Sequence, residues 1–194
     1  CYFYYCISCA DSDYTYKTKR RIKMKKILAS ILICTTLTGC TTKQVHDKYY
    51  LQTIYIKNKN DRIYTEMVFY NDNSEIVEAD GDNFDEILKK SELSCGKTIF
   101  TGHTELIIMN NCDNYETLDY MLNEFKVSPS CKAVLGSDNL DVEYITSDVI
   151  NVAIEQKKAP KCDIITILSD LDANEAHTIY FNSDSSFQQA VITN

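Results

Sequence analysis

The alternation of apolar and polar residues is clearest just past the first quarter of the chain, where it predicts three β-strands. β-branched and aromatic residues dominate 49–56 and again 62–70, and the turn cluster Asn58-Lys59-Asn60-Asp61 separates the two runs. Two such runs joined by a short polar turn are typical of a β-hairpin. A second turn at 71–74 and a short run at 75–79 add a third strand.

Four helices are predicted farther along, where apolar residues recur every three or four positions. The first follows the N-cap candidate Asp80-Gly81-Asp82-Asn83, the second covers 115–125 and stops before Ser128-Pro129-Ser130, the third covers 142–154, and the fourth covers 163–171. The side chains expected to face the core are Phe84, Ile87, Leu88 and Leu93 in the first helix, Tyr115, Leu118, Met121, Leu122 and Phe125 in the second, and Tyr144, Ile145, Val149, Ile150 and Ala153 in the third.

Further apolar runs alternate with these helices and predict strands at 104–109, 131–135, 178–181 and 187–192. A hairpin followed by alternating strands and helices is typical of α/β and α+β domains. We therefore expect an α+β (mixed α/β) fold, in which a mixed β-sheet with an N-terminal hairpin is packed against helices.

The N-terminal part has the features of a targeting segment. Met24-Lys25-Lys26 precedes an apolar run at 27–34, which is too short for a membrane-spanning helix of about 20 residues. Leu37-Thr38-Gly39-Cys40 then resembles the lipobox of bacterial lipoproteins. The resemblance implies a signal peptide over 24–39, cleavage between Gly39 and Cys40, and a diacylglycerol or palmitate anchor on the Cys40 sulfur. It also implies that residues 40–48, which are mostly polar, form a tether.

Residues 1–23 precede this opening and are interpreted as upstream sequence or a mis-assigned start. They contain Cys6-Ile7-Ser8-Cys9, but a zinc site needs four ligands and no histidine lies nearby. The alternative is that the basic residues Lys19, Arg20, Arg21 and Lys23 extend the charged region of a longer signal peptide, which leaves the cleavage site unchanged.

The formal net charge of −8 over 194 residues hides an asymmetry between the two parts. Residues 1–39 hold 7 of the 20 Lys and Arg and 2 of the 28 Asp and Glu, which leaves 13 and 26, a net charge of −13, for residues 40–194. A basic head on an acidic body is typical of an exported protein. Because binding to phosphates requires clustered Lys and Arg, we expect no nucleic-acid partner.

Motifs for catalysis are missing from the sequence, which has no GxGxxG, P-loop, HExxH or GxSxG pattern. The histidines His46, His103 and His177 are far apart, and Asp80-Gly81-Asp82 lacks the closing glutamate of a calcium loop. We interpret His103, which follows Gly102, as a hydrogen-bonded structural group. A catalytic base or metal ligand at His103 is the alternative. The prediction is therefore a protein that is not an enzyme and has no metal or other cofactor besides the covalent lipid.

Four cysteines follow Cys40 in the body of the chain: Cys95, Cys112, Cys131 and Cys162. Outside the membrane they allow three pairings, among which the sequence does not choose. Four ordinary buried thiols are the favoured interpretation, because the predicted core is large enough without disulfides.

A family resemblance rests on the order of these features. After the lipobox, hairpin and first helix come Lys97-Thr98-Ile99-Phe100-Thr101-Gly102-His103 with its apolar strand, then a helix, then Cys131-Lys132-Ala133-Val134-Leu135-Gly136. This resembles the N-terminal domain of the Ger(x)C family, the lipoprotein C subunit of spore germinant receptors, in which a Gly-His pair opens an apolar strand. The resemblance implies such a domain over 49–160, with 161–194 as the possible start of a truncated second domain.

The resemblance also implies a function. A C subunit would lie on the outer face of the spore inner membrane, beside integral membrane subunits of a nutrient germinant receptor, and act by assembly or signal relay. A ligand-binding lipoprotein of another export or uptake system is the first alternative, and a surface hydrolase is the second. The germinant and the partner surface stay open at this stage.

Overall fold

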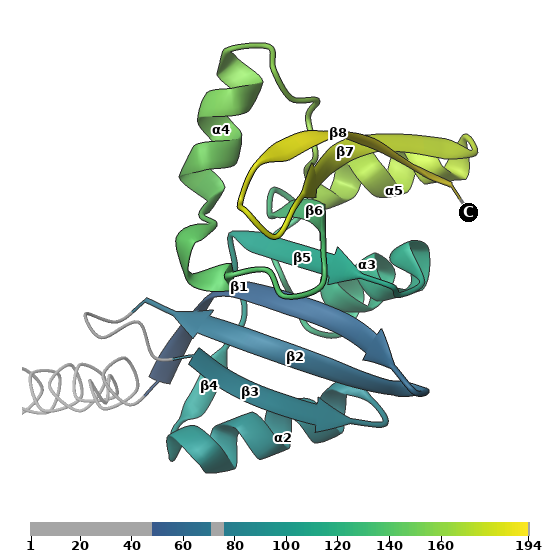
Figure 1. Ribbon diagram of the computed structural model, residues 1–194. Coiled ribbons are helices and arrows are strands. Elements are labelled where there is room, and N and C mark those ends of the chain that lie inside the picture. The colour runs from purple at the N-terminus through teal and green to yellow at the C-terminus, as the bar shows by residue number, and fades with distance from the viewer. Residues whose placement is uncertain (1–47, 71–75, 194) are drawn as a thin grey trace, which may run out of the picture. The chain divides into compact units, whose positions relative to one another are not determined.

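The computed structural model describes residues 48–70 and 76–193, which form one mixed sheet flanked by helices (Figure 1). The strands are β1 (Lys48–Lys59), β2 (Arg62–Phe69), β3 (Ile76–Gly81), β4 (Thr98–Phe100), β5 (Leu106–Asn110), β6 (Lys132–Gly136), β7 (Glu175–Phe181) and β8 (Phe187–Thr193). Their order in space is β3-β2-β1-β5-β6-β7-β8, and β4 pairs with the first residues of β1. The predicted α+β class with a mixed sheet is confirmed.

The first two strands form the predicted hairpin, in which Lys59 pairs with Arg62. The turn residues Asn60 and Asp61 have φ angles of 54° and 60°. A two-residue turn between twisted strands requires positive φ at both positions, and Asn and Asp tolerate it well. β3 then pairs antiparallel with β2, so all three strands of this half of the sheet were predictable from local sequence.

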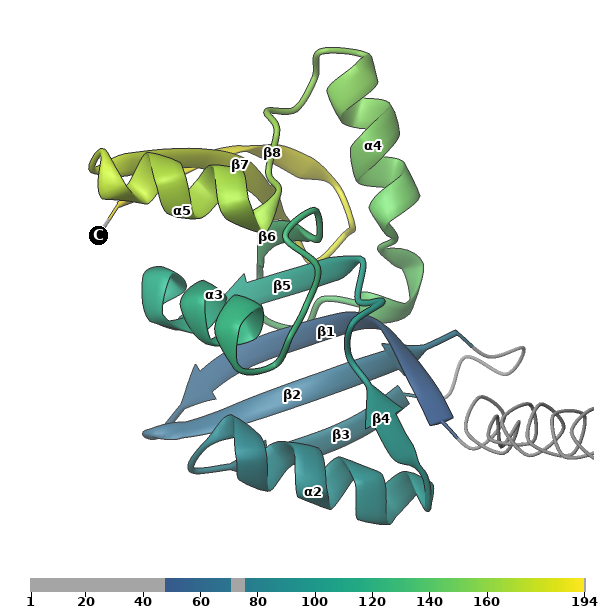
Figure 2. The same cartoon turned by 180° about the vertical axis from the view of Figure 1, so that it is seen from behind.

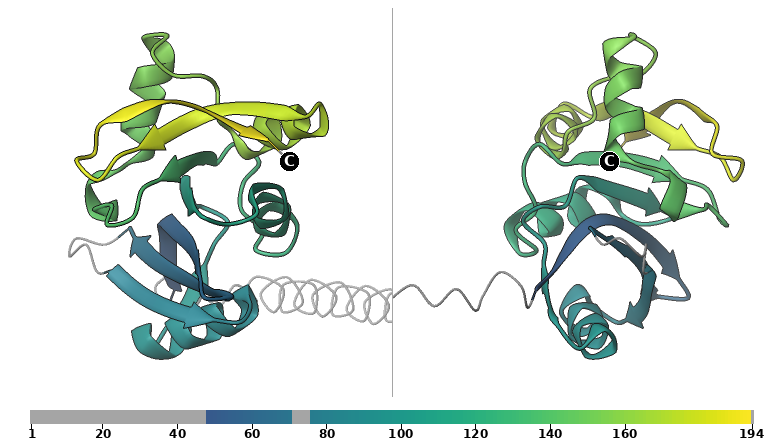
Figure 3. Two further views of the ribbon diagram at one scale, coloured as in Figure 1. Left: turned by 45° about the vertical axis from the view of Figure 1, so that its right-hand side comes forward. Right: turned by 90° about the vertical axis from the view of Figure 1, so that its left-hand side faces the viewer.

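Four parallel strands, β1, β5, β6 and β7, form the centre of the sheet. A parallel sheet is normally covered on both faces, and β5 accordingly contains four consecutive buried residues, Leu106–Met109. The helices are α2 (Phe84–Cys95), α3 (Asn114–Asn123), α4 (Ser147–Glu155) and α5 (Ile164–Asp172). Three of them, α2, α3 and α5, lie over the same face of the sheet (Figure 2), whereas α4 stands apart from them (Figure 3).

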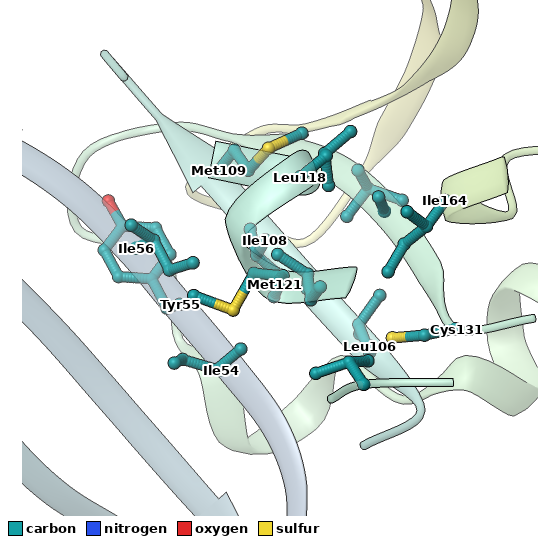
Figure 4. Packing of buried hydrophobic residues seen from close by; sticks show 14 of the residues in the cluster. Ile54, Tyr55, Ile56, Leu106, Ile108, Met109, Leu118, Met121, Cys131 and Ile164 are labelled. Carbon is teal, nitrogen blue, oxygen red and sulfur yellow. The ribbon is translucent and has the colours of Figure 1, made fainter. Parts of the chain in front are cut away.

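Helix α3 is packed tightly on the parallel strands. Its fully buried side chains Leu118 and Met121 lie over β1 and β5, where Met121 lies close to Ile54 and Ile56 (Figure 4). Burial of one such side chain contributes about 1.5–3 kcal/mol to folding. The core-facing positions predicted for the middle of this helix are therefore correct, whereas Tyr115 in its first turn is exposed.

Side-chain caps start both α2 and α3. The Asn83 carboxamide oxygen accepts a hydrogen bond from the Glu86 amide at 3.0 Å, and the Asp113 carboxylate accepts one from the Glu116 amide at 2.9 Å. Each cap satisfies an amide that has no partner within the helix. Asp80 and Asp82 pair instead with the Arg62 guanidinium, at 2.9 and 3.3 Å.

The prediction that Leu93 faces the core is wrong, because its side chain is 83% exposed. The buried positions in the middle of α2 are Ile87 and Ser91, which lie four residues apart on one face of the helix. Leu93 lies two residues beyond Ser91, and two positions along a helix place it on a different face.

The single helix predicted over 142–154 is also wrong. A 3₁₀ turn over Val142–Tyr144 is followed by α4, and Ile145 and Thr146 between them are extended. Thr146 occupies the N-cap of α4, where extended backbone angles are normal. The break turns Tyr144 outward, 70% exposed, and Val149 is 45% exposed, whereas Ile145, Ile150 and Ala153 are buried as predicted.

The boundary predicted after residue 160 is not found. The described residues from 48 to 193 belong to one compact unit, because β7 pairs with β6 and α5 lies on the same face as α3. A backbone hydrogen bond also joins the residues before 160 to those after it, since the Ala133 amide donates to the Cys162 carbonyl at 2.8 Å. Residues 161–193 therefore complete the sheet and core that 49–160 begin, and the prediction of a second domain starting at 161 is wrong.

The predictions for the N-terminal part fall outside the described residues. These are the upstream segment 1–23, the signal peptide 24–39, the cleavage site at Gly39 and Cys40, and all but the last residue of the 40–48 tether. Lys48, that last residue, is the first residue of β1.

Candidate functional site

A hollow lies at the end of the sheet where β1, β5 and β6 begin. It has a volume of about 650 Å³ and includes the Gly102-His103 pair that the sequence singled out. Its lining comes from five parts of the chain: Tyr50 in β1, Tyr70 after β2, Gly102, His103, Thr104 and Glu105 before β5, Ser128, Ser130, Cys131 and Lys132 at the start of β6, and Ser147 and Asn151 in α4. A concave, polar-lined site of this size is suited to a small ligand or to a partner's side chains.

Gly102 and His103 lie in a turn just before β5. The Thr104 amide and hydroxyl both donate to the Thr101 carbonyl, at 3.0 and 2.7 Å, which closes the turn. A Cβ at position 102 would lie 2.9 Å from Cζ of Phe100, so a larger residue here would require the aromatic ring to shift. The turn leads directly into β5, so the prediction that this pair precedes an apolar strand is correct.

The His103 side chain is exposed and contacts aromatic rings. Its ring centroid lies 5.3 Å from that of Phe100 and 5.9 Å from that of Tyr50. The backbone carbonyl of His103 accepts a hydrogen bond from the Tyr70 hydroxyl at 3.4 Å. We keep the interpretation of His103 as a structural residue. Its imidazole, however, packs against aromatic rings at the surface, whereas a hydrogen-bonded structural histidine would be expected to be buried.

We expect His103→Ala to lower the free energy of unfolding by about 1 kcal/mol or less, because an exposed pair of aromatic contacts is lost. The measurement is urea unfolding of the full chain followed by circular dichroism. His177→Ala is the matched control, since His177 is an exposed histidine on β7. A loss above about 2 kcal/mol at His103 alone, or bound zinc that disappears in this variant, would contradict this prediction.

Glu105 connects three elements around the hollow. The Ser147 hydroxyl at the start of α4 donates to the Glu105 carboxylate at 2.8 Å. The Tyr70 phenol, just after β2, is hydrogen-bonded to the same carboxylate. The pKa of this phenol lies above its usual value, mainly because of burial and secondly because of this hydrogen bond. Glu105 therefore holds β2, β5 and α4 together at one side of the hollow.

Lys132 and Asp163 form an ion pair at the other side, between the start of β6 and the residue before α5. Both side chains are largely covered, and the two residues also face each other in an isolated antiparallel bridge. This backbone bridge holds the two residues opposite each other, so that their charged side chains meet.

The cysteines beside this ion pair are poor nucleophiles. Cys131 and Cys162 are free and buried, and desolvation raises the pKa of Cys131 above its usual value and that of Cys162 to about 11. A reactive cysteine needs the opposite shift, because the thiolate is the nucleophile. The favoured interpretation of buried thiols therefore fits these two positions, whereas Cys95 and Cys112 are only half-buried.

The raised pKa values of these buried thiols predict that the protein loses stability at alkaline pH. The unfolded chain releases the Cys162 proton near pH 9, whereas the folded chain keeps it until about pH 11, so the unfolded state gains in this window. The free energy of unfolding should fall by up to about 3 kcal/mol between these pH values on account of Cys162. Urea unfolding as a function of pH measures the slope, and Cys162→Ala should reduce it. An unchanged slope in this variant would contradict the assignment.

Residues that coordinate metal do not gather at this site. Among residues 48–70 and 76–193, no group of three or more His, Cys, Asp or Glu side chains is placed to hold a metal ion. Within the same ranges, no helix is both long and apolar enough to span a membrane.

Sequence reasoning identified Gly102 and His103 but missed most of the residues around them. Tyr50, Tyr70, Glu105, Lys132 and Ser147 are brought together by strand pairing and by the position of α4. Only one local feature could have indicated two of these residues: Glu105 and Lys132 are each a charged residue at the start of an apolar strand.

Comparisons with known proteins return no match: no family model, no curated protein and no solved structure is similar to this chain. The function must therefore be argued from the residues and their geometry.

Proposed function

We propose that this chain is a membrane-anchored lipoprotein subunit of a nutrient germinant receptor, of the Ger(x)C type, and that it acts in spore germination by assembly or signal relay. The observation that carries the proposal is the order along the chain: a lipobox ending at Cys40, a hairpin, and the Gly102-His103 pair before an apolar strand. The polar hollow around this pair supports a contact surface for integral membrane subunits.

The chemistry of the hollow supports binding and not catalysis. Glu105 is hydrogen-bonded to Ser147, Lys132 is paired with Asp163, and the Cys131 thiol is held protonated by burial. A nucleophile activated by an adjacent base, the usual requirement for covalent catalysis, is not seen among these groups in the described part of the chain. The proposed protein works by contact, on the outer face of the membrane.

The anchor is tested by lipid labelling. The full chain, expressed in a Gram-positive host fed radiolabelled palmitate, should incorporate label and stay in the membrane fraction. Cys40→Ala should lose both, because the thioether to the lipid needs this sulfur. Cys34→Ala is the matched control, since Cys34 lies within the apolar run of the signal. Label and membrane retention that persist in Cys40→Ala would refute the anchor.

Deletion of the gene tests the receptor function. Germination triggered by nutrients should slow, whereas germination by agents that bypass the nutrient receptors should be unchanged. Each nutrient is tested separately, because a second receptor can replace the first for some of them. Complementation with the unmodified gene should restore the rate, and complementation with Cys40→Ala should not. Unchanged germination with every nutrient would refute this function.

The hollow of about 650 Å³ specifically favours a second candidate, a ligand-binding lipoprotein of an uptake system. Loss of uptake of one solute, with nutrient germination intact, would establish this candidate instead. The neighbouring genes discriminate as well: genes for a spore permease and an integral receptor subunit favour the receptor, and a gene for a transporter ATPase favours uptake.

A further inference from the structure

Basic and aromatic side chains gather where β1 begins and β4 pairs with it. Nζ of Lys48 lies 5.5 Å from the ring centroid of Phe100, and Nζ of Lys97 lies 4.6 Å from that of Tyr49. The ring of Phe100 also lies 5.6 Å from that of Tyr50 and 5.3 Å from that of His103. We name this set the β1-start cluster; its members are Lys48, Tyr49, Tyr50, Lys97, Phe100 and His103.

The β1-start cluster occupies the end of the domain that the tether reaches. Lys48 lies eight positions after Cys40, and a chain of this length spans at most about 28 Å. β1 then runs for 12 residues, so its far end lies about 36 Å beyond its start. With a lipid on Cys40, the start of β1 is confined near the bilayer, whereas the hairpin turn at Asn60 and Asp61 can lie far from it.

The chemistry of the cluster suits a layer of lipid headgroups. Tyrosine rings favour the boundary between water and hydrocarbon, and lysines place their stems on apolar surface while the ammonium groups stay in water. Lys97 and His103 are exposed, and Lys48, Tyr49, Tyr50 and Phe100 are half-buried. Residues 40–194 as a whole are acidic, with a net charge of −13 that includes the two lysines of the cluster, so the chain outside the cluster is repelled by anionic lipids.

We infer that the β1-start cluster docks onto anionic lipid headgroups and orients the domain on the membrane, an inference that rests on the proposed anchor at Cys40. The anchor retains the protein, and the cluster decides which end faces the bilayer. Because Tyr50 and His103 also line the hollow, docking places the hollow beside the membrane surface, where a membrane-embedded partner can reach it.

The chain has no tryptophan, so one introduced tryptophan reports its own surroundings. The palmitate-labelled full chain is reconstituted into vesicles of phosphatidylcholine and phosphatidylglycerol that carry brominated acyl chains, which quench nearby tryptophan. Phe100→Trp should be quenched and shifted to shorter wavelength. Tyr115→Trp, an exposed site at the other end of the parallel strands, should show neither effect. Circular dichroism checks that both variants are folded.

Charge reversal tests the lipid chemistry. In the Phe100→Trp background, Lys48→Glu with Lys97→Glu should reduce the docked population at least about 30-fold, because each lysine near an anionic surface contributes a factor of about five to six. Lys59→Glu with Lys158→Glu changes the net charge equally at exposed sites away from the cluster and should leave quenching unchanged. Vesicles of phosphatidylcholine alone should give weaker quenching than the mixed vesicles.

The outcomes separate this inference from the proposed function. Equal quenching at positions 100 and 115, or quenching that survives reversal of Lys48 and Lys97, overturns the docking of the cluster while palmitate label still supports the anchor. Absence of label in the unmodified chain overturns both. Quenching confined to position 100, and lost with the two lysines, supports the inference.

Discussion

A chain that ends at residue 160 is expected to remain unfolded. The missing part supplies nine buried apolar residues: Cys162, Ile164, Ile167, Leu168, Leu171, Ala176, Ile179, Phe181 and Ile192. At about 1.5–3 kcal/mol for each large side chain, their loss is about 10–20 kcal/mol, as large as the whole 5–15 kcal/mol by which a typical domain is stable. Circular dichroism and limited proteolysis of the shortened chain measure the effect.

A chain that ends at residue 186 is the matched control for this truncation. It lacks only β8, an edge strand in which Ile192 is the one buried residue. This chain should keep its cooperative unfolding transition at a lower midpoint. Cooperative unfolding of the chain that ends at 160 would contradict the single folding unit that the strand pairing indicates.

Gly136→Val is expected to destabilise the protein by about 3 kcal/mol. Gly136 is buried at the end of β6, and a Cβ there would lie 2.6 Å from Cγ2 of Ile108 and 2.9 Å from Cδ2 of Leu140. Both neighbours belong to the core, so neither can move away without disturbing other contacts. Urea unfolding of the variant and the unmodified chain gives the difference.

A double variant tests the cause of this destabilisation. Ile108→Ala removes the methyl group that lies closest to the new side chain, and by itself should cost about 2–5 kcal/mol as a cavity. Combined with Gly136→Val, it should cost less than the two single changes together, because the new side chain fills part of the cavity. Strictly additive losses would mean that the contact with Ile108 is not the cause.

Local signals explain which elements the sequence predicted well. The hairpin carries its turn residues Asn60 and Asp61, and α2 and α3 carry their caps Asn83 and Asp113. Each signal acts within a few residues, so it can be recognised without knowledge of the fold.

The errors arise where distant residues decide the structure. β4 has only three residues, which is too short for a recognisable pattern of apolar and polar positions. It forms because Thr98–Phe100 pairs with the start of β1, about fifty positions earlier. The family resemblance implied a boundary after residue 160, yet Lys132 and Asp163 hold the two sides together. The hollow is assembled in the same way, so its polar residues were not recognised as a group.

The order of the strands in space also has a consequence for how fast the protein folds. β1 is the first of the described strands but lies in the middle of the sheet, where Ile54 pairs with Ile107, and two strands farther on Leu135 pairs with Tyr180. Pairings between residues so distant along the chain form late and slowly, whereas a hairpin forms within microseconds. A chain that is synthesised from its N-terminus completes β1, β5 and β6 before Phe181 emerges. The edge of β6 that pairs with β7 stays unpaired until then, so the partly emerged chain exposes a strand edge that can pair with other chains.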